Sequence, residues 1–443
     1  MRREVRNWAG NQRCRPAAVE RPRSEAEIAD AVRAAAAARR RVRVIGAGHS
    51  FTDAAMTDGT LLVLDRHQEV LALDRERGLV TVQAGLPLWK LSRILDDEGL
   101  ALPNLGDIAY QSVAGAVSTA THGTGRRLGN LSTFVEGLRL VLADGSVLEC
   151  SAAREPEVFD AARVSLGALG VLSSVTLRCV PAFDLHAVEM PQRLDGLLEA
   201  LDTEIDGHDH FEFFWVPHTG WALTKRNDRT TAPRAPRPRW EAFCDDVLIS
   251  NLAFGALCEI GRWRPESIPR LARALPSRGR VEYVDRSHRV FASPRLVRFV
   301  EMELAIPRAA AVEVVRRVRD LVKREDLRLS FPVEVRFVAA DELPLSPAFG
   351  RETCYVAVHV YRGMPFERYF RGVERICADY GARPHWGKLH FHSAETLAPL
   401  YPAWERFQAV RARLDPEGRF SNAYLERVLG PAAGGVVGAS PRR

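Results

Sequence analysis

The sequence is short of lysine, lacks paired cysteines and contains no long apolar run. The 443-residue chain carries 62 Lys and Arg residues, and its only lysines are Lys90, Lys225, Lys323 and Lys388. Together with the Ala-rich stretches, this excess of arginine is typical of a GC-rich coding genome. The net charge of +6 is spread along the chain, without a long basic run interleaved with aromatics. We therefore expect no nucleic-acid partner, and a lysine within a motif is more informative than an arginine.

The cysteines and the apolar runs exclude further classes of protein. The seven cysteines are scattered and form no CxxC pair, which argues against a disulfide framework or a zinc site. The N-terminal MRREVRNWAGNQ lacks the apolar core of a signal peptide. The longest apolar stretch, residues 247–260, falls short of the roughly 18 residues of a membrane span and contains Ser250. We expect a cytoplasmic protein without a transmembrane segment, with peripheral membrane association as the alternative.

The first part of the chain mixes short strands with helices. Ser24, followed three residues later by Glu27, predicts a helix start, which residues 28–40 continue. A second helix is expected to end at Gly99, and Asp144-Gly145 predicts a hairpin turn. Short strands are expected at residues 41–48, 61–65, 70–74 and 79–85.

After Pro181 the chain changes to longer strands and helices. The strands expected at residues 282–291, 297–307, 327–340 and 353–363 would form one antiparallel sheet. Helices at residues 309–326 and 366–381 would pack on it. We predict an α+β protein with a first domain over residues 1–184, a second over 185–382, and a segment, 383–443, that returns to the first.

Two glycine-rich segments are candidates for ligand binding. VIGAGHSF, residues 44–51, follows a strand, and its glycines let the backbone approach a ligand or hold a phosphate. It is not a dinucleotide-binding fingerprint, because Phe51 stands where the third glycine belongs, and a plain tight turn explains it equally well. Residues 106–125 are rich in Gly, Ala and Thr and almost uncharged. They either wrap a large ligand or form a buried loop.

Two further motifs carry charged side chains. In SFPVEVRF, strand alternation places Glu334 and Arg336 on one face. A carboxylate beside a guanidinium can grip a polyol and stabilise an oxyanion, although an exposed cross-strand ion pair is the alternative. Lys388, in HWGKLH, is a lysine in a chain that mostly uses arginine, which indicates that this position requires a compact ammonium. His390 would share its face if this segment is extended.

Taken together, the motifs resemble the aldonolactone oxidoreductases. In the family's order the chain contains NWAGNQ, VIGAGHS, MTDG, VQAG, LALPNLG, VAGAVSTATHGTG, ADG, VFDAARVSLGALG, RPHWGKLH and LDPEGRFSNAYLERVLG. The family includes L-gulono-1,4-lactone oxidase and D-arabinono-1,4-lactone oxidase, with alditol oxidase as a relative, within the vanillyl-alcohol oxidase superfamily. The resemblance covers nearly the whole chain and is sparse between residues 185 and 295. It implies a two-domain PCMH-type FAD-binding fold with an antiparallel-sheet substrate (cap) domain.

The resemblance also implies FAD, joined covalently through His49. Gly106 would leave room for dioxygen beside the reduced flavin and so favours an oxidase, although it could also merely allow a turn. His122 is expected to be structural or a neighbour of the flavin phosphates. The implied cofactor-binding residues are Gly46, Ala47, Gly48, His49, Ser50, Gly106, Ser112, Gly115, Thr119, His122, Gly123, Gly170, Val171 and Lys388.

The catalytic residues that the resemblance implies are Glu334, Arg336, Lys388 and His359, the last by a looser alignment. The implied reaction takes a hydride from the carbon bearing the C2 hydroxyl of a sugar 1,4-lactone to flavin N5. Dioxygen then accepts the electrons and gives hydrogen peroxide, and the lactone product enolises to ascorbate or an analogue. A lactone dehydrogenase that uses cytochrome c or quinone, and an alditol oxidase, remain alternatives. The sequence shows no metal-ligand spacing, P-loop or nucleophile elbow.

Overall fold

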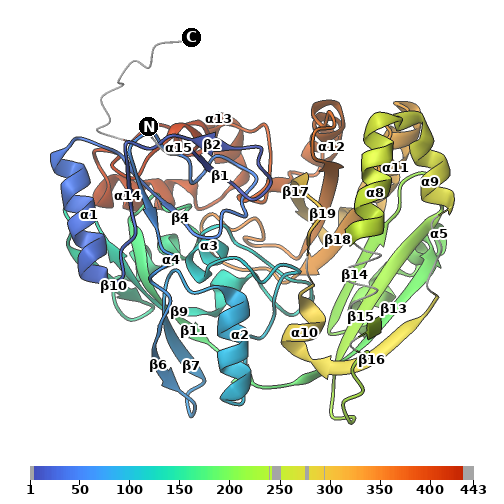
Figure 1. The fold of residues 1–443 in the computed structure, drawn as a ribbon, viewed down its shortest axis with the longest axis horizontal. Helices are drawn as coiled ribbons and strands as arrows, with labels where there is room; N and C mark the ends of the chain where they lie inside the picture. Colours follow the sequence, from blue (N-terminus) through green and yellow to red (C-terminus); the bar gives the residue numbers. More distant parts are fainter. Residues whose placement is uncertain (1–3, 239, 242–250, 275–278, 294, 433–443) are drawn as a thin grey trace.

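The chain forms two halves that lie side by side (Figure 1). The computed structural model describes residues 4–238, 240–241, 251–274, 279–293 and 295–432. Helices and mostly antiparallel sheets occur in both halves, as the α+β prediction requires. No helix among these described residues is long and apolar enough to cross a membrane.

The first half contains a small parallel sheet and a larger antiparallel one. The parallel sheet has the order β3 (Ala18–Glu20), β5 (Thr60–Val63), β4 (Val42–Ile45). The antiparallel sheet has the order β10 (Val147–Ser151), β9 (Val135–Val141), β11 (Val171–Arg178), β7 (Leu79–Gln83), β6 (Val70–Asp74). Two-residue strands form the pairs β1 (Val5–Arg6) with β2 (Arg13–Cys14), and β8 (Leu100–Ala101) with β12 (Val180–Pro181).

Helices cover these sheets where the sequence signals place them. The Ser24 side chain accepts a hydrogen bond from the Glu27 N–H and caps α1 (Glu25–Ala37). The helix α2 (Leu88–Asp97) ends just before Gly99, and Gly145 turns the β9–β10 hairpin at a φ of 81°. The remaining helices here are α3 (Val113–Ser118), the 3-10 turn η1 (Leu131–Phe134) and α4 (Pro156–Arg163).

An eight-stranded antiparallel sheet organises the second half. Its order is β16 (Val281–Arg286), β13 (Asp184–Arg193), β15 (Trp221–Thr230), β14 (His210–Trp215), β18 (Val333–Val338), β19 (Thr353–Tyr361), β17 (Phe299–Pro307), β20 (Arg383–Pro384). The apolar faces of α11 (Ala311–Arg324) and α12 (Glu367–Ala378) share one core with its strands. Shorter helices flank the sheet: α5 (Leu194–Glu199), α6 (Leu201–Gly207), α8 (Phe254–Trp263), α9 (Ile268–Ala274) and α10 (Ser287–Phe291).

Parts of the predicted strand boundaries are wrong. The strand expected over residues 282–291 ends at Arg286, and the chain turns into α10. This turn carries Phe291 into the core, where its ring meets the rings of Phe183 and His210 edge-on. Of the strand expected over residues 327–340, only β18 is extended. The apolar stretch at 247–260 falls partly outside the described residues, and its described end belongs to α8.

The last part of the chain lies against the first half, where Figure 1 shows α13 (Ala394–Leu397), α14 (Trp404–Leu414) and α15 (Ala423–Leu429) above the N-terminal strands. Trp404, Phe407 and Leu425 are buried in the core that α1 and α2 also use. The predicted domain boundaries at residues 184 and 382 fall beside β13 and β20, the first and last strands of the large sheet, and they stay a prediction.

Candidate active site

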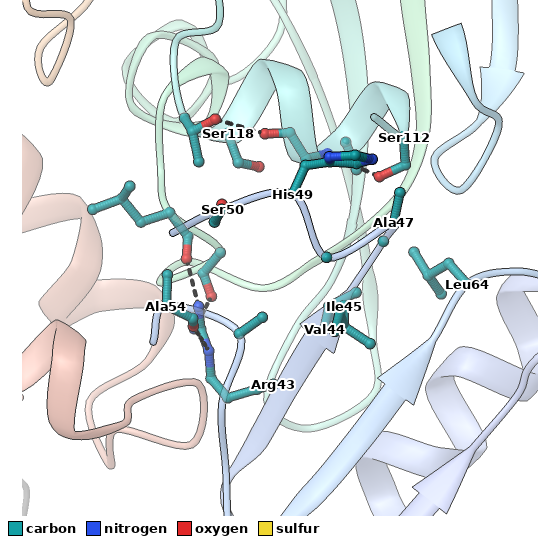
Figure 2. Close-up of a pocket in the computed structure, with 18 of the residues that line it drawn as sticks. Arg43, Val44, Ile45, Ala47, His49, Ser50, Ala54, Leu64, Ser112 and Ser118 are labelled. Atoms are coloured by element: carbon teal, nitrogen blue, oxygen red, sulfur yellow. Dashed lines mark hydrogen bonds between the residues drawn. The ribbon is translucent and has the colours of Figure 1, made fainter. Parts of the chain in front are cut away.

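A cavity that opens to solvent lies in the first half (Figure 2), and the empty space in it and at its mouth, open solvent included, is about 1030 Å³. The turn after β4 and the start of α3 form two of its walls, and the stretch 166–172 forms another. Many residues that the motifs marked for cofactor binding line it: Gly46, Ala47, Gly48, His49, Ser50, Ser112, Gly115, Thr119 and Gly170.

Tight packing explains the two glycines of the turn after β4. A Cβ at Gly46 would lie 2.0 Å from the Ser112 hydroxyl oxygen, which caps α3 by accepting a hydrogen bond from the Gly115 N–H. Gly48 has a φ of +70°, which side chains other than hydrogen disfavour. The turn after β4 therefore also forms part of the cavity wall, and ligand binding by this turn stays a prediction.

His49 projects into this cavity with an unused ring nitrogen (Figure 2). Its Nδ1 is buried and has no hydrogen-bond partner among the described residues. Burial, with a smaller contribution from the Lys388 ammonium, lowers the pKa of His49 to about 4, so the ring is neutral at physiological pH. The rings of Trp8 and Tyr110 stack near it, with centroids at 5.6 and 6.3 Å.

The other predicted cofactor residues lie outside this cavity lining. A Cβ at Gly106 would lie 3.0 Å from the His122 carbonyl oxygen, and one at Gly123 would lie 2.3 Å from the Leu105 carbonyl oxygen. These two glycines therefore let the segments around residues 105 and 122 pack closely together. Val171 begins β11 with its side chain in the core, while His122 and Lys388 belong to the charged cluster described below.

Arg43, which sequence reasoning missed, fastens three distant segments around the cavity. Its buried guanidinium donates hydrogen bonds to the carbonyl oxygens of Ala54, Gly167, Leu166 and Phe420. Burial lowers the pKa of Arg43 to about 10, with Asp415 opposing the shift, so the group stays charged. Asn422 adds bonds from the C-terminal FSNAY motif to the loop at residues 53–56. That motif thus holds the cavity wall in place.

Replacement of Arg43 by Met is expected to lower the free energy of unfolding by about 3 kcal/mol or more, because it leaves several buried carbonyl groups without donors. Urea titration of the purified protein measures this change. Arg66→Met, at an exposed arginine, is the matched control and should change stability little. Equal stabilities for the two variants would contradict the proposal that Arg43 holds these three segments together.

A second site lies on the large sheet, where a row of charged side chains crosses adjacent strands. Glu212 on β14 lies opposite Arg336 on β18, and Glu301 on β17 lies opposite His359 on β19. Glu334, two residues before Arg336, completes the row. All five are buried, although strands β14, β18, β19 and β17 are otherwise mostly apolar.

Arg336 is the centre of this row. Its Nε lies 2.7 Å from carboxylate oxygens of both Glu212 and Glu334, and a terminal nitrogen lies 2.5 Å from Asp107. Asp107 follows Gly106 in the first half of the chain and also pairs with Arg295 at 2.8 Å. The predicted Glu334–Arg336 pair is therefore a buried ion pair within a network that joins both halves, and the exposed-pair alternative is wrong.

The network gives Glu334 an unusual pKa. Burial raises the pKa of Glu334 to about 7; Arg336 opposes this rise, while the carboxylates of Asp107 and Glu212 add to it. Burial also raises the pKa of Asp107, but Arg336 and Arg295 outweigh it and leave that pKa well below the ordinary range. Glu334 can therefore gain or lose a proton near neutral pH.

Lys388 and His359 meet at the other end of the row. The Lys388 ammonium lies 2.5 Å from one carboxylate oxygen of Glu301, and His359 Nε2 lies 3.5 Å from the other. His359 Nε2 is also 3.9 Å from Glu334, and its Nδ1 lies 3.1 Å from the Pro332 carbonyl oxygen. The structure therefore brings Glu334, Arg336, His359 and Lys388 together.

His122, Glu303 and His385 form a buried cluster next to this row. His122 Nε2 lies 3.1 Å from Glu303, and His122 Nδ1 lies 2.8 Å from the Gly123 carbonyl oxygen. His385 Nδ1 accepts a hydrogen bond from the Gly387 N–H, so the proton of its neutral ring is on Nε2.

Sequence reasoning missed the carboxylates that hold the row together: Asp107, Glu212, Glu301 and Glu303. The strand FVEMELAIP did contain a signal, because alternation puts Glu301 and Glu303 on one face of an otherwise apolar strand. His390 was predicted to share a face with Lys388, and this is wrong. The segment is not extended, and His390 Nε2 instead meets the Tyr424 hydroxyl at 3.2 Å.

Comparison with known proteins decides the family. The profile of the D-arabinono-1,4-lactone oxidase family matches residues 175–428, and that of an FAD-binding domain matches residues 16–151. L-gulono-1,4-lactone dehydrogenase of Mycobacterium tuberculosis is 50% identical over 426 residues, which cover 96% of this chain and 99% of that protein. The chain belongs to the aldonolactone oxidase family. The resemblance in the motifs is thereby confirmed.

Other relatives of this aldonolactone oxidase family member differ in their named activity. L-gulonolactone oxidase of Bos taurus is 36% identical over 434 residues, covering 96% of this chain and 98% of that protein. Alditol oxidase of a Streptomyces species is 32% identical over 444 residues, covering 96% and 99%.

Solved structures confirm the fold. A solvent-stable cholesterol oxidase superposes with a TM-score of 0.82 at 18% identity, covering 97% of both chains. The cholesterol oxidase of B. sterolicum superposes with a TM-score of 0.80 at 17% identity, covering 97% of this chain and 96% of that one. At such low identity the likeness establishes the vanillyl-alcohol-oxidase/PCMH-type architecture alone.

Proposed function

We propose that this protein is an FAD-dependent oxidoreductase that oxidises a sugar 1,4-lactone at its C2 hydroxyl, with dioxygen as the electron acceptor. One observation carries the proposal: the charged row on the large sheet ends at Lys388, and the Lys388 segment lies against the turn that carries His49. The Phe51 N–H donates to the Gly387 carbonyl oxygen at 2.8 Å, and the Lys388 ammonium lies 5.2 Å from the centre of the Phe51 ring. A redox cofactor in that cavity and a polyhydroxylated substrate on the row would therefore meet. The relatives named as lactone oxidases and dehydrogenases support the substrate class.

The cavity residues suit FAD. Gly46, Ala47 and Gly48 line the cavity with backbone and small side chains, and His49 presents a neutral, unpartnered nitrogen. The turn after β4 and the residues around Ser112 would hold the cofactor. When bound, its flavin supplies the two-electron acceptor for the hydride.

The row of charges supplies the polar chemistry for the substrate. The Arg336 guanidinium, fixed by three carboxylates, and the Lys388 ammonium would stabilise negative charge that develops on the reacting hydroxyl oxygen. Glu334, with its pKa near 7, is poised to bind substrate hydroxyls and to hold or release their proton. Burial of these groups excludes water and strengthens each interaction.

Covalent attachment of the flavin through His49 is part of the proposal. A neutral imidazole with a free lone pair is the form able to make such a bond, and burial keeps the ring in this form. Acid-precipitated protein should therefore keep its yellow fluorescence, and His49→Ala protein should release FAD into the supernatant. Tyr110→Phe, which keeps the neighbouring ring, should remain yellow after precipitation. A colourless wild-type pellet would refute the attachment.

The electron acceptor is proposed on the basis of Gly106. The resemblance to the family implies that this position lies beside the flavin, where a glycine leaves room for dioxygen. In the structure, a Cβ at Gly106 would lie 3.0 Å from the His122 carbonyl oxygen, so close packing of the chain explains the glycine as well. The alternative is a dehydrogenase that passes the electrons to cytochrome c or quinone, and a 50%-identical relative is named as a dehydrogenase. Rapid mixing of substrate-reduced protein with air-saturated buffer separates the two, because slow reoxidation would reject dioxygen as the acceptor.

Cytoplasmic location is also proposed. The six cysteines that the structure describes are unpaired, which suits a reducing compartment. For peripheral membrane association, the candidate surface carries the exposed apolar side chains of Leu252, just before α8, and of Ile260 and Trp263 within it. Fractionation of expressing cells distinguishes the two.

A further inference from the structure

We propose that Glu301 is a positioning residue whose carboxylate holds the Lys388 ammonium and the His359 ring in place beside Glu334. This inference rests on the proposed function for its catalytic meaning, but the arrangement itself is a property of the protein. None of the sequence motifs included Glu301.

The position of Glu301 is fixed by backbone pairing on both sides. On one side β17 pairs with β19, which places Glu301 directly opposite His359. On the other side the Leu389 N–H donates to the Glu301 carbonyl oxygen at 2.8 Å, which brings the HWGKLH segment along the same strand. Lys388 and His359 come from segments 29 residues apart, and Glu301 is the residue that both contact.

The two oxygens of Glu301 serve different partners. Oε2 lies 2.5 Å from the Lys388 ammonium, and Oε1 lies 3.5 Å from His359 Nε2. The Pro332 carbonyl oxygen accepts only from a protonated Nδ1 of His359. Glu301 therefore fixes the rotamer of a four-carbon side chain and orients the His359 ring between two carboxylates. A lysine held in this way loses less freedom when substrate binds.

Electrostatics makes the same arrangement stable. Burial would lower the pKa of Lys388, but Glu301 and Glu303 outweigh it and raise that pKa above its ordinary value. Burial would raise the pKa of Glu301, but Lys388 and His359 hold it at about 2. The Glu301 carboxylate is thus ionised and keeps its neighbour charged. The titratable groups that face this pair are His49, Glu303, Glu334, His359 and His385.

The test uses the scarcity of lysine in this chain. Protein labelled with ¹³C at the lysine ε-carbon gives four side-chain signals, and loss of one signal in Lys388→Arg assigns Lys388. In the wild-type holoenzyme this signal should not titrate at pH values where the protein stays folded. In Glu301→Gln the same signal should titrate within this pH range. Its midpoint moves to lower pH because the neutral amide no longer favours the ammonium.

Three variants separate positioning from a general effect on the fold. Glu301→Gln should lower kcat about 100-fold with a smaller change in KM, and Glu301→Asp should recover most of the rate and the wild-type titration. Glu303→Gln removes the next carboxylate on the same face, which contacts His122, and should move the Lys388 midpoint less. A Lys388 signal that titrates identically in the wild type and in Glu301→Gln would overturn the proposal. This NMR result does not depend on lactone turnover, so it is independent of the proposed function.

Discussion

Replacement of Lys388 by Met is expected to lower kcat about 10³-fold while the protein keeps its FAD. The reason is that this ammonium ends the charged row at Glu301 and lies over the ring of Phe51, which follows Ser50 of the cavity wall, so we expect negative charge on the reacting oxygen to develop beside it. Loss of a single preorganised group of this kind typically costs 10²- to 10³-fold in rate. Anaerobic reduction of the flavin by substrate, followed by stopped-flow absorbance, measures the step directly.

Lys388→Arg is the informative companion variant. A guanidinium keeps the charge but is larger and planar, and the site holds a compact ammonium against Glu301 and over the Phe51 ring. We expect it to restore little of the rate. Lys323→Met, on exposed surface of α11, is the control and should leave the rate unchanged. A Lys388→Met enzyme with normal flavin reduction would show that the ammonium has no part in the reaction.

Replacement of Arg336 by Met is expected to affect stability as well as activity. It leaves Asp107, Glu212 and Glu334 near one another with fewer counter-charges, and breaking a buried ion pair in this way costs about 3–5 kcal/mol. The free energy of unfolding should fall by that amount, and kcat/KM should fall about 10³-fold through the loss of an oxyanion-stabilising cation. Chemical denaturation and steady-state kinetics measure the two effects separately.

A second substitution distinguishes the two contributions of Arg336. Adding Glu334→Gln to Arg336→Met removes one of the carboxylates that lost its counter-charge. The double variant should therefore recover part of the lost stability without recovering the rate. The double-mutant cycle isolates this coupling. Additive stability effects would mean that Arg336 and Glu334 do not interact in the folded protein.

The sequence predicted the local elements of the first half well, because their signals are local. The Ser24 cap, the end of α2 before Gly99 and the Asp144-Gly145 turn each depend on a few neighbouring residues. The strand expected over 282–291 failed for the opposite reason. Its last five residues turn into α10 because Phe291 packs against distant rings, and periodicity within the segment does not reveal that contact.

The candidate site was predictable only where a motif carried it. The glycine turn, His49, Glu334, Arg336 and Lys388 all stand in recognisable motifs, whereas their partners do not. Asp107 reaches Arg336 only because the two halves meet, and Glu301 reaches Lys388 only because the HWGKLH segment runs beside β17. The sequence did not distinguish Arg43 from the many other arginines. Its four carbonyl partners come from segments as far apart as Ala54 and Phe420, and no local pattern reveals such contacts.

Anaerobic reduction of the bound flavin by a panel of sugars, followed by exposure to air, tests the central claim most directly. The panel sets L-gulono-1,4-lactone and D-arabinono-1,4-lactone against open-chain alditols such as xylitol. We predict that the lactones bleach the visible flavin absorbance within seconds, that alditols do so far more slowly, and that air restores the colour with formation of hydrogen peroxide. Fast bleaching by alditols without bleaching by lactones, or a protein that carries no flavin, would contradict the account.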